Sequence, residues 1–295
     1  MIDDRLVRDL LRDQHPDLAD QDVRFAATGW DNQLWRLGDA LAVRLPHATE
    51  RGSSLLVKEH RWLPLLAPRL PLPVPTPVRI GRPSARFPHH WTVVTWVPGD
   101  PADRAPISDR GAADAVAGFL RALHREAPAD APTSLNRGGP LGPLTPEFDG
   151  VLRAGDLGTS AGDVRQVWRD AVAAPRWGGP PVWLHGDLHP ANVVVSDGAL
   201  AGVIDFGELC AGDPATDLAA AWLLLPAGAD ARFFDAYGAA DEAVVRRARG
   251  WALLRAAVLI AVGDAGERGL AGGKPTWGPA GRRALDRVLA AASGS

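Results

Sequence analysis

Hydrophobic and polar positions follow different periods in the first third of the chain and in the rest. In the first part, short β-prone runs are separated by turn residues such as Gly38-Asp39. These runs predict strands at residues 23–27, 33–37, 41–45, 78–81 and 91–97. Apolar residues at helical spacing predict a helix at the start of the chain and another over residues 55–66, where Pro64 cuts into its end. The first part therefore reads as a small sheet with one crossing helix.

After the break at residues 98–101, the pattern is mainly that of amphipathic helices. Helices are predicted at residues 109–126, 162–173, 217–225, 229–237, 242–262 and 282–292. Short strands are predicted at residues 181–184, 193–195 and 202–204, and residues 127–146, rich in Pro and Gly, are expected to be a loop. The pattern predicts an α+β fold with two domains, residues 1–98 and 99–295.

Composition excludes several classes of protein. A net charge of -3 gives no overall basic field for nucleic acid, and no apolar stretch is long enough to span a membrane. The chain opens with a mixture of charged and apolar residues rather than the apolar run of a signal peptide. Its single cysteine, Cys210, excludes a disulfide framework, and we expect it to be a small buried residue. A location in the reducing cytoplasm fits these features.

The densest group of chemically useful residues is HGDLHPAN at positions 185–192, followed by IDFG at 204–207. Phosphoryl transfer requires an aspartate beside the acceptor hydroxyl and oxygen ligands for Mg²⁺. Asp187 can orient the hydroxyl and accept its proton, while Asn192 and Asp205 offer the oxygen ligands that a hard cation prefers. A hairpin formed by residues 193–195 and 202–204 would return Asp205 close to Asn192. The pattern predicts Mg²⁺-dependent phosphoryl transfer.

Here the chain resembles the aminoglycoside phosphotransferase family, a branch of the protein-kinase-like fold. The resemblance rests on HGDLHPANVVV, on IDFGE, and on DPATDLA at 213–219. It implies a bilobal fold, with a small antiparallel sheet and one crossing helix in the first lobe and a larger, mainly helical second lobe. It also implies that Asp187 is the catalytic aspartate and that Asn192 and Asp205 bind Mg²⁺. His185 would pack under the catalytic loop, and Asp217 would brace it.

The family places a phosphate-binding cation on the third strand and a partner acid on the next helix. Arg44 takes that strand position, which departs from the usual Lys, but Arg is always charged and grips phosphate oxygens with a planar fork. Glu59 is the expected partner, with Glu50 as the weaker candidate. A solvent-facing strand arginine is the alternative for Arg44.

The rest of the predicted nucleotide site is less specific. The turn at residues 28–32 takes the position of the phosphate-covering loop, so Gly29 and Asn32 are expected to contact ATP or GTP, although one glycine is a weak signal. The strand that ends at the domain boundary carries Thr95 and Val97, which match the family's hinge. A merely structural turn and strand are the alternatives.

Other readings of the motif remain open. His185, Asp187 and His189 could hold a zinc ion in a hydrolase, although no further ligands stand at matching spacings. Asp217 could be only a helix N-terminal acid favoured by the helix dipole. A non-catalytic nucleotide-binding module is also possible, because Arg44 departs from the family pattern.

The acceptor is predicted from the resemblance and from the charges of the second domain. The resemblance favours an aminoglycoside-type antibiotic, inactivated by O-phosphorylation. Aminoglycosides are polycations, so acidic residues would be expected around their site. Acids and arginines are instead equal in number between residues 226 and 270: Asp230, Asp235, Asp241, Glu242, Asp264 and Glu267 against Arg232, Arg246, Arg247, Arg249, Arg255 and Arg268. This balance keeps a macrolide, or a small metabolite such as a sugar or amino alcohol, as the alternative acceptor.

Overall fold

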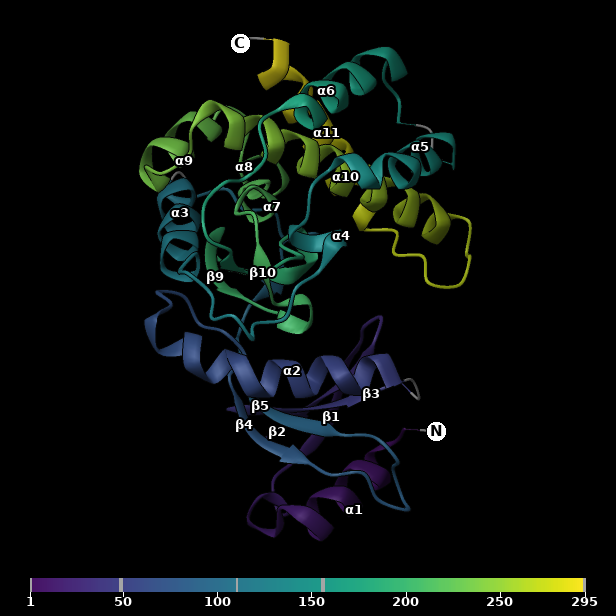
Figure 1. Ribbon diagram of the computed structural model, residues 1–295. Coiled ribbons are helices and arrows are strands. Elements are labelled where there is room, and N and C mark those ends of the chain that lie inside the picture. Colours follow the sequence, from purple (N-terminus) through teal and green to yellow (C-terminus); the bar gives the residue numbers. More distant parts are fainter. Residues whose placement is uncertain (1, 48–49, 110, 155–156, 294–295) are drawn as a thin grey trace. The chain divides into compact units, whose positions relative to one another are not determined.

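The computed structural model describes residues 2–47, 50–109, 111–154 and 157–293 (Figure 1). These residues form two compact units. Unit 1 consists of Met1–Val97 together with Val203–Gly207, and unit 2 of Pro98–Gly202 together with Glu208–Ser295. The short segment that carries Asp205 therefore belongs to unit 1, although it follows a long stretch of unit 2 in the sequence.

Unit 1 is built on a five-stranded antiparallel sheet in the order β1-β2-β3-β5-β4. Its strands are β1 (Val23–Thr28), β2 (Asn32–Leu37), β3 (Leu41–Pro46), β4 (Pro77–Gly81) and β5 (Trp91–Thr95). Two helices accompany them, α1 (Asp4–Gln14) and α2 (Glu50–Leu66), and lie on opposite sides of the sheet in Figure 1. All the strands and helices predicted for this part of the chain are confirmed. Pro64 stands inside the last turn of α2, which begins five residues before the predicted start.

Alternation along β3 decides what each side of the sheet packs against. Val43 and Leu45 are fully buried in a cluster that includes Leu10 of α1 and Trp91 of β5. Because successive strand residues point to opposite faces, Arg44 points to the other side, toward α2. One face of the sheet is thus an apolar core, and the other carries the charged group.

Unit 2 is mainly helical, as the sequence predicts. Its helices are α3 (Ala112–Leu123), α4 (Leu135–Gly138), α5 (Thr145–Ala154), α6 (Ala161–Ala173), α7 (Ala215–Leu218), α8 (Ala220–Leu223), α9 (Asp230–Tyr237), α10 (Glu242–Glu267) and α11 (Trp277–Ser293). Short strands are β6 (Asp100–Pro101), β7 (Val182–Leu184), β8 (Val193–Ser196), β9 (Ala199–Val203) and β10 (Cys210–Gly212). They form a β10-β7 pair and a β6-β8-β9 sheet, both antiparallel where they pair.

The structure corrects the sequence-based prediction at several places in unit 2. The segment expected to be a loop, residues 127–146, contains α4 and the start of α5, and the strand β10 was not predicted. The helix expected at 217–225 begins at Ala215 and is divided into α7 and α8. The sequence of α4 is mostly polar, and its one apolar residue, Leu135, is exposed. The regular spacing of apolar residues by which a helix is predicted is therefore missing there.

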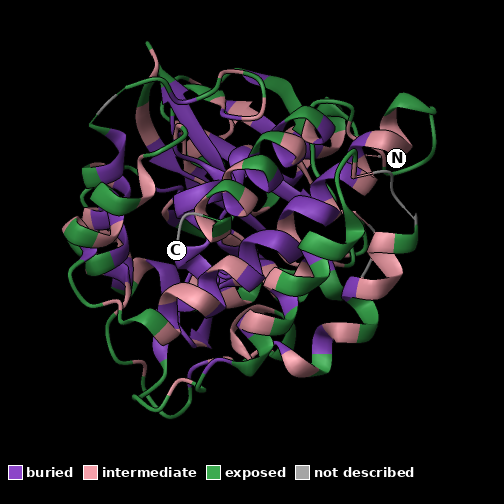
Figure 2. Ribbon diagram, turned by 90° about the horizontal axis from the view of Figure 1, so that it is seen from above, coloured by how far each residue is buried: buried purple, intermediate pink, exposed green. Residues whose placement is uncertain are grey.

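The long helix α10 forms the centre of unit 2. Its buried positions include Trp251, Leu253 and Ile260. Figure 2 colours buried parts of the chain purple. It packs closely on α11, where a Cβ atom on Gly263 would stand 2.2 Å from the backbone nitrogen of Gly278. This contact allows the two backbones to approach, because glycine has no side chain to separate them. Within the described residues, no helix is both long and apolar enough to cross a membrane.

Candidate functional site

The HGDLHPAN segment follows strand β7, which pairs with β10. Its first turn depends on Gly186, whose φ of 81° lies in the left-handed region. A Cβ atom there would stand 2.6 Å from the carbonyl oxygen of Glu208, so only glycine fits. His185 is fully buried beside it, and its Nδ1 accepts a hydrogen bond from the backbone nitrogen of Asp187 at 3.2 Å. The histidine thus fixes the backbone from which the Asp187 side chain projects.

Asp217 anchors this loop from α7. Its carboxylate accepts hydrogen bonds from the backbone nitrogens of His185, at 2.6 Å, and Gly186, at 2.9 Å. The side chain is fully buried, and its Oδ2 also lies 3.3 Å from Nε2 of His124. These contacts match the bracing that the resemblance implies, and they go well beyond the dipole interaction of an ordinary helix N-terminal acid.

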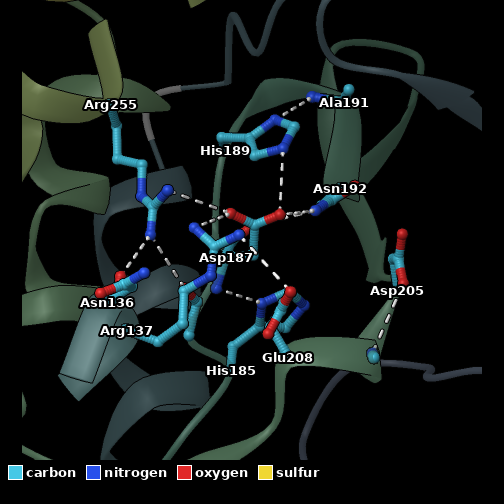
Figure 3. Close-up of polar contacts among 12 residues, drawn as sticks. Asn136, Arg137, His185, Asp187, His189, Ala191, Asn192, Asp205, Glu208 and Arg255 are labelled. Atoms are coloured by element: carbon cyan, nitrogen blue, oxygen red, sulfur yellow. Dashed lines mark hydrogen bonds and ion pairs between the residues drawn. The ribbon is translucent and has the colours of Figure 1, made fainter. Parts of the chain in front are cut away.

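Cationic and amide donors face both oxygens of the Asp187 carboxylate (Figure 3). Arg137 Nη1 lies 3.1 Å from Oδ1, and Arg255 Nη1 lies 3.6 Å from the same oxygen. Oδ2 lies 3.4 Å from the amide nitrogen of Asn192 and 3.6 Å from Nε2 of His189. Burial by itself would raise the pKa of Asp187, but His189 and the two arginines lower it well below its usual range. The side chain is therefore a carboxylate at neutral pH.

Asn192 closes the same loop at the end of a short turn, Pro190–Asn192. Its side-chain nitrogen donates to the backbone oxygen of Asp187 at 2.9 Å. This bond fixes the amide so that its oxygen is the atom left to act as a ligand, which suits Mg²⁺. The donor chemistry of Asn192 therefore fits the metal role that the resemblance implies.

Asp205 lies in unit 1, together with the strand cation Arg44. It is a non-glycine residue with a φ of 62°, a conformation that is uncommon for any residue with a side chain. Its side chain is 53% exposed, and Oδ1 lies 3.4 Å from Arg44 Nη2. An exposed carboxylate held in an unusual backbone conformation suits a metal ligand. Since Asp187 and Asn192 belong to unit 2, the use of one metal ion by Asn192 and Asp205 together is a proposal.

Arg44 and Glu59 form a buried ion pair between β3 and α2. Arg44 Nη1 donates to both carboxylate oxygens of Glu59 at 2.6 Å, and the two side chains are 7% and 2% exposed. Burial alone would lower the pKa of Arg44, but the charges of Glu59 and Asp205 raise it, so the guanidinium stays charged. Arg44 is thus not a solvent-facing strand residue, and its partner on α2 is Glu59 rather than Glu50.

The other residues predicted to bind nucleotide lie at two ends of the sheet. The backbone nitrogen of Gly29 donates to the carbonyl oxygen of Asn32 at 2.8 Å, so this amide is used inside the turn between β1 and β2. Thr95 ends β5, and its hydroxyl donates to the Val74 carbonyl at 3.2 Å, while Val97 is buried. Their contact with nucleotide stays a prediction.

The two histidines of the motif are not arranged as metal ligands. Nδ1 of His185 accepts from the backbone of Asp187, and Nδ1 of His189 accepts from the backbone of Ala191 at 3.3 Å. In a neutral ring the proton is then on Nε2, so neither imidazole offers a lone pair to a metal. Among the residues that the structure describes, no group of three or more His, Cys, Asp or Glu side chains could hold a metal ion. This geometry argues against the zinc hydrolase.

The sequence prediction missed the two arginines that face Asp187. Arg137 lies on α4, inside the segment expected to be a loop, and Arg255 was counted only as one base in a balanced set. Neither stands near the HGDLHPAN motif in the sequence, and arginine is most often a surface residue. No local pattern distinguishes them, so only the folded chain identifies them.

The chain is similar to known phosphotransferases. A family model described as the phosphotransferase enzyme family matches residues 22–255. An aminoglycoside 3'-phosphotransferase of Escherichia coli is 29% identical over 158 residues. That alignment covers 50% of this chain and 58% of the relative, so the chain spans little more than half the length of the curated relatives it matches.

Solved structures share the fold over nearly the whole chain. The GDP complex of an aminoglycoside 2'-phosphotransferase-IIIa superposes with a TM-score of 0.68 and 18% identity, covering 99% of this chain and all of that one. A macrolide 2'-phosphotransferase from Brachybacterium faecium gives a TM-score of 0.63 and 21% identity, covering 93% of this chain and 97% of the other. The α+β fold predicted from the sequence is therefore confirmed.

Proposed function

Because the chain belongs to the phosphotransferase enzyme family, we propose that it transfers the terminal phosphate of ATP or GTP to a hydroxyl group of a small molecule. The observation that carries this proposal is the state of Asp187. Its carboxylate is anionic, is held on both oxygens, and stands on a loop braced by Asp217. A fixed carboxylate beside the reacting hydroxyl is the group that phosphoryl transfer requires.

Each residue has a defined part in the proposed reaction. Asp187 accepts a hydrogen bond from the acceptor hydroxyl and orients its oxygen toward the terminal phosphate. It takes up the hydroxyl proton as the new oxygen–phosphorus bond forms and the bond to the leaving nucleoside diphosphate breaks. Asn192 and Asp205 would hold Mg²⁺, which when bound neutralises charge on the phosphates. Arg44, held in place by Glu59, binds phosphate oxygens from β3. His185 and Asp217 keep the loop in the conformation that presents Asp187.

The remaining nucleotide contacts belong to the same proposal. The turn with Gly29 and Asn32 would cover the phosphates, and the backbone near Thr95 and Val97 would pair with the base. A cytoplasmic location, where ATP, GTP and Mg²⁺ are available, is part of this proposal as well.

For the acceptor we propose an aminoglycoside-type antibiotic, the class named for the Escherichia coli relative. One observation favours a second candidate, a less charged acceptor such as a macrolide or a sugar. Arg137 and Arg255 face the proposed catalytic carboxylate, so ammonium groups next to the reacting hydroxyl would meet two guanidinium groups of the same charge.

The test is a panel of hydroxylated acceptors incubated with ATP or GTP and Mg²⁺, with product detected as the mass increase of one phosphate. The panel contains aminoglycosides, macrolides, sugars and amino alcohols. Asp187→Ala is expected to abolish turnover while nucleotide binding, measured by calorimetry, stays unchanged. Asp187→Asn, which keeps the size of the side chain, guards against loss of folding in the alanine variant. Full turnover in both variants would refute the assignment of Asp187.

A further inference from the structure

Two arginines from distant parts of unit 2 converge on one oxygen of Asp187. Arg137 approaches Oδ1 from α4 and Arg255 approaches it from α10, and Figure 3 shows both guanidinium groups directed at the carboxylate. Both side chains are mostly buried, at 20% and 14% exposure. An ordinary surface ion pair joins one carboxylate to one flexible, exposed cation. Two mostly buried arginines on the same carboxylate oxygen therefore need a separate explanation.

The fold brings Arg137 to this place through a backbone-to-backbone contact. A Cβ atom on Gly138 would lie 3.1 Å from Cα of Gly212, and a Cβ atom on Gly212 would lie 2.5 Å from the Gly138 oxygen. Glycine at both positions lets α4 lie directly on β10, and the backbone nitrogen of Asp213 donates to the Gly138 oxygen at 3.0 Å. The short helix is therefore fixed on strand β10, which pairs with the strand leading to Asp187.

Arg255 links this helix to the catalytic loop. Its Nη2 donates to the backbone oxygen of Asn136 on α4, at 3.3 Å, and lies 3.5 Å from the backbone oxygen of Gly186. Burial lowers the pKa of Arg255 to about 10, although the charge of Asp187 acts in the opposite direction. The group is still a cation at neutral pH. One guanidinium thus holds α10, α4 and the loop around Asp187.

The positive charges of the two arginines are balanced by the carboxylates of Asp187 and Glu208. Arg137 Nη2 lies 3.5 Å from Oε1 of Glu208, so the same guanidinium faces two carboxylates. A buried ion pair adds little net stability, because removing both charges from water costs about as much as their attraction returns. Stability alone is therefore a poor reason for the cluster. A fixed direction for the carboxylate is a better one, because planar guanidinium groups hold carboxylates in defined geometry.

We infer that Arg137 and Arg255 are positioning residues for the proposed phosphoryl transfer: they hold Oδ1 of Asp187 and so turn Oδ2, which lies beside Asn192 and His189, toward the acceptor hydroxyl. This inference rests on the proposed function. Oδ2 is the oxygen on the side of Asn192, the proposed metal ligand, so a hydroxyl bound there would be directed at the phosphate. Neither arginine needs to contact the substrate for this role.

The test replaces Arg137 by alanine and by lysine. Arg137→Ala is expected to lower kcat about 100-fold, the usual loss when a fixed polar group of an active site is removed, with the KM for nucleotide unchanged. Guanidinium ions added at low concentration are expected to restore part of the kcat of Arg137→Ala. The kcat of Arg137→Lys is expected to lie between those of the wild type and Arg137→Ala. Because Asp187→Asn itself is expected to abolish turnover, the coupling between Arg137 and Asp187 is measured by thermal unfolding rather than by kcat.

A matched control is available on α10. Arg246 pairs with Asp170 at 2.6 Å and stands on the same helix as Arg255, so Arg246→Ala removes an ion pair without touching Asp187. It is expected to keep the wild-type kcat. A wild-type kcat in Arg137→Ala would overturn the inference.

Failure of the proposed function gives a different result. In that case the wild-type chain phosphorylates no acceptor of the panel. The interaction between Arg137 and Asp187 is then measured from the Tm values of Arg137→Ala, Asp187→Asn and the double variant. Shifts in Tm that are not additive support the coupling of the two residues, and strictly additive shifts overturn it.

Discussion

Replacing Asp217 by alanine separates the two roles that the sequence left open for it. As a helix N-terminal acid it would contribute only about 0.3–1 kcal/mol through the helix dipole. In the structure it instead accepts two backbone hydrogen bonds, from His185 and Gly186, at 2.6 and 2.9 Å, and it is fully buried. Hydrogen bonds to a charged group contribute about 1.5–3 kcal/mol each, so the expected loss of unfolding free energy is about 3–6 kcal/mol.

The assay is urea unfolding followed by tryptophan fluorescence, since the chain has 11 tryptophans. Asp230→Ala is the control, because Asp230 also stands in the first turn of a helix, α9. We expect kcat to fall as well, because the loop that presents Asp187 loses its anchor. If Asp217→Ala and Asp230→Ala destabilise the protein equally, by less than about 1 kcal/mol, Asp217 acts only through the dipole and the bracing argument is wrong.

Two further predictions concern buried polar groups. Glu59→Gln leaves Arg44 buried without its main counter-charge and is expected to lower the unfolding free energy by about 3 kcal/mol, whereas Glu50→Gln should change it by less than about 0.5 kcal/mol. Equal urea midpoints for the two variants would contradict this. Burial and the nearby charges of Asp217 and Asp213 raise the pKa of Tyr237 to about 12. Because the unfolded chain ionises near pH 10, this contribution to stability is complete below about pH 10 and is lost as the pH rises toward 12. Tyr237 is the chain's single tyrosine, so its ultraviolet titration measures the effect directly, and identical titrations with and without urea would refute it.

Local sequence determined the residues of the proposed reaction and the elements that carry them. HGDLHPAN and IDFG identify Asp187, Asn192 and Asp205 because phosphoryl transfer needs these residue types at short spacings. Short β-prone runs bounded by turn residues predicted the strands of unit 1, and one face of that sheet is buried against α1. The resemblance to the family predicted Arg44 and Glu59 as partners, and the structure places their side chains in contact between β3 and α2.

Only the tertiary structure decided what surrounds those residues. Arg137 and Arg255 reach Asp187 because α4 lies on β10 and because Arg255 of α10 donates to the Asn136 backbone of α4. Neither contact leaves a period or motif in the sequence. The brace from Asp217 likewise depends on α7 lying under the loop. A motif records which atoms the chemistry requires, because those residues cannot change type. The directions of these side chains and the charges around them depend on packing between segments that are distant in sequence. Many different sequences can produce the same packing, so it leaves no local pattern.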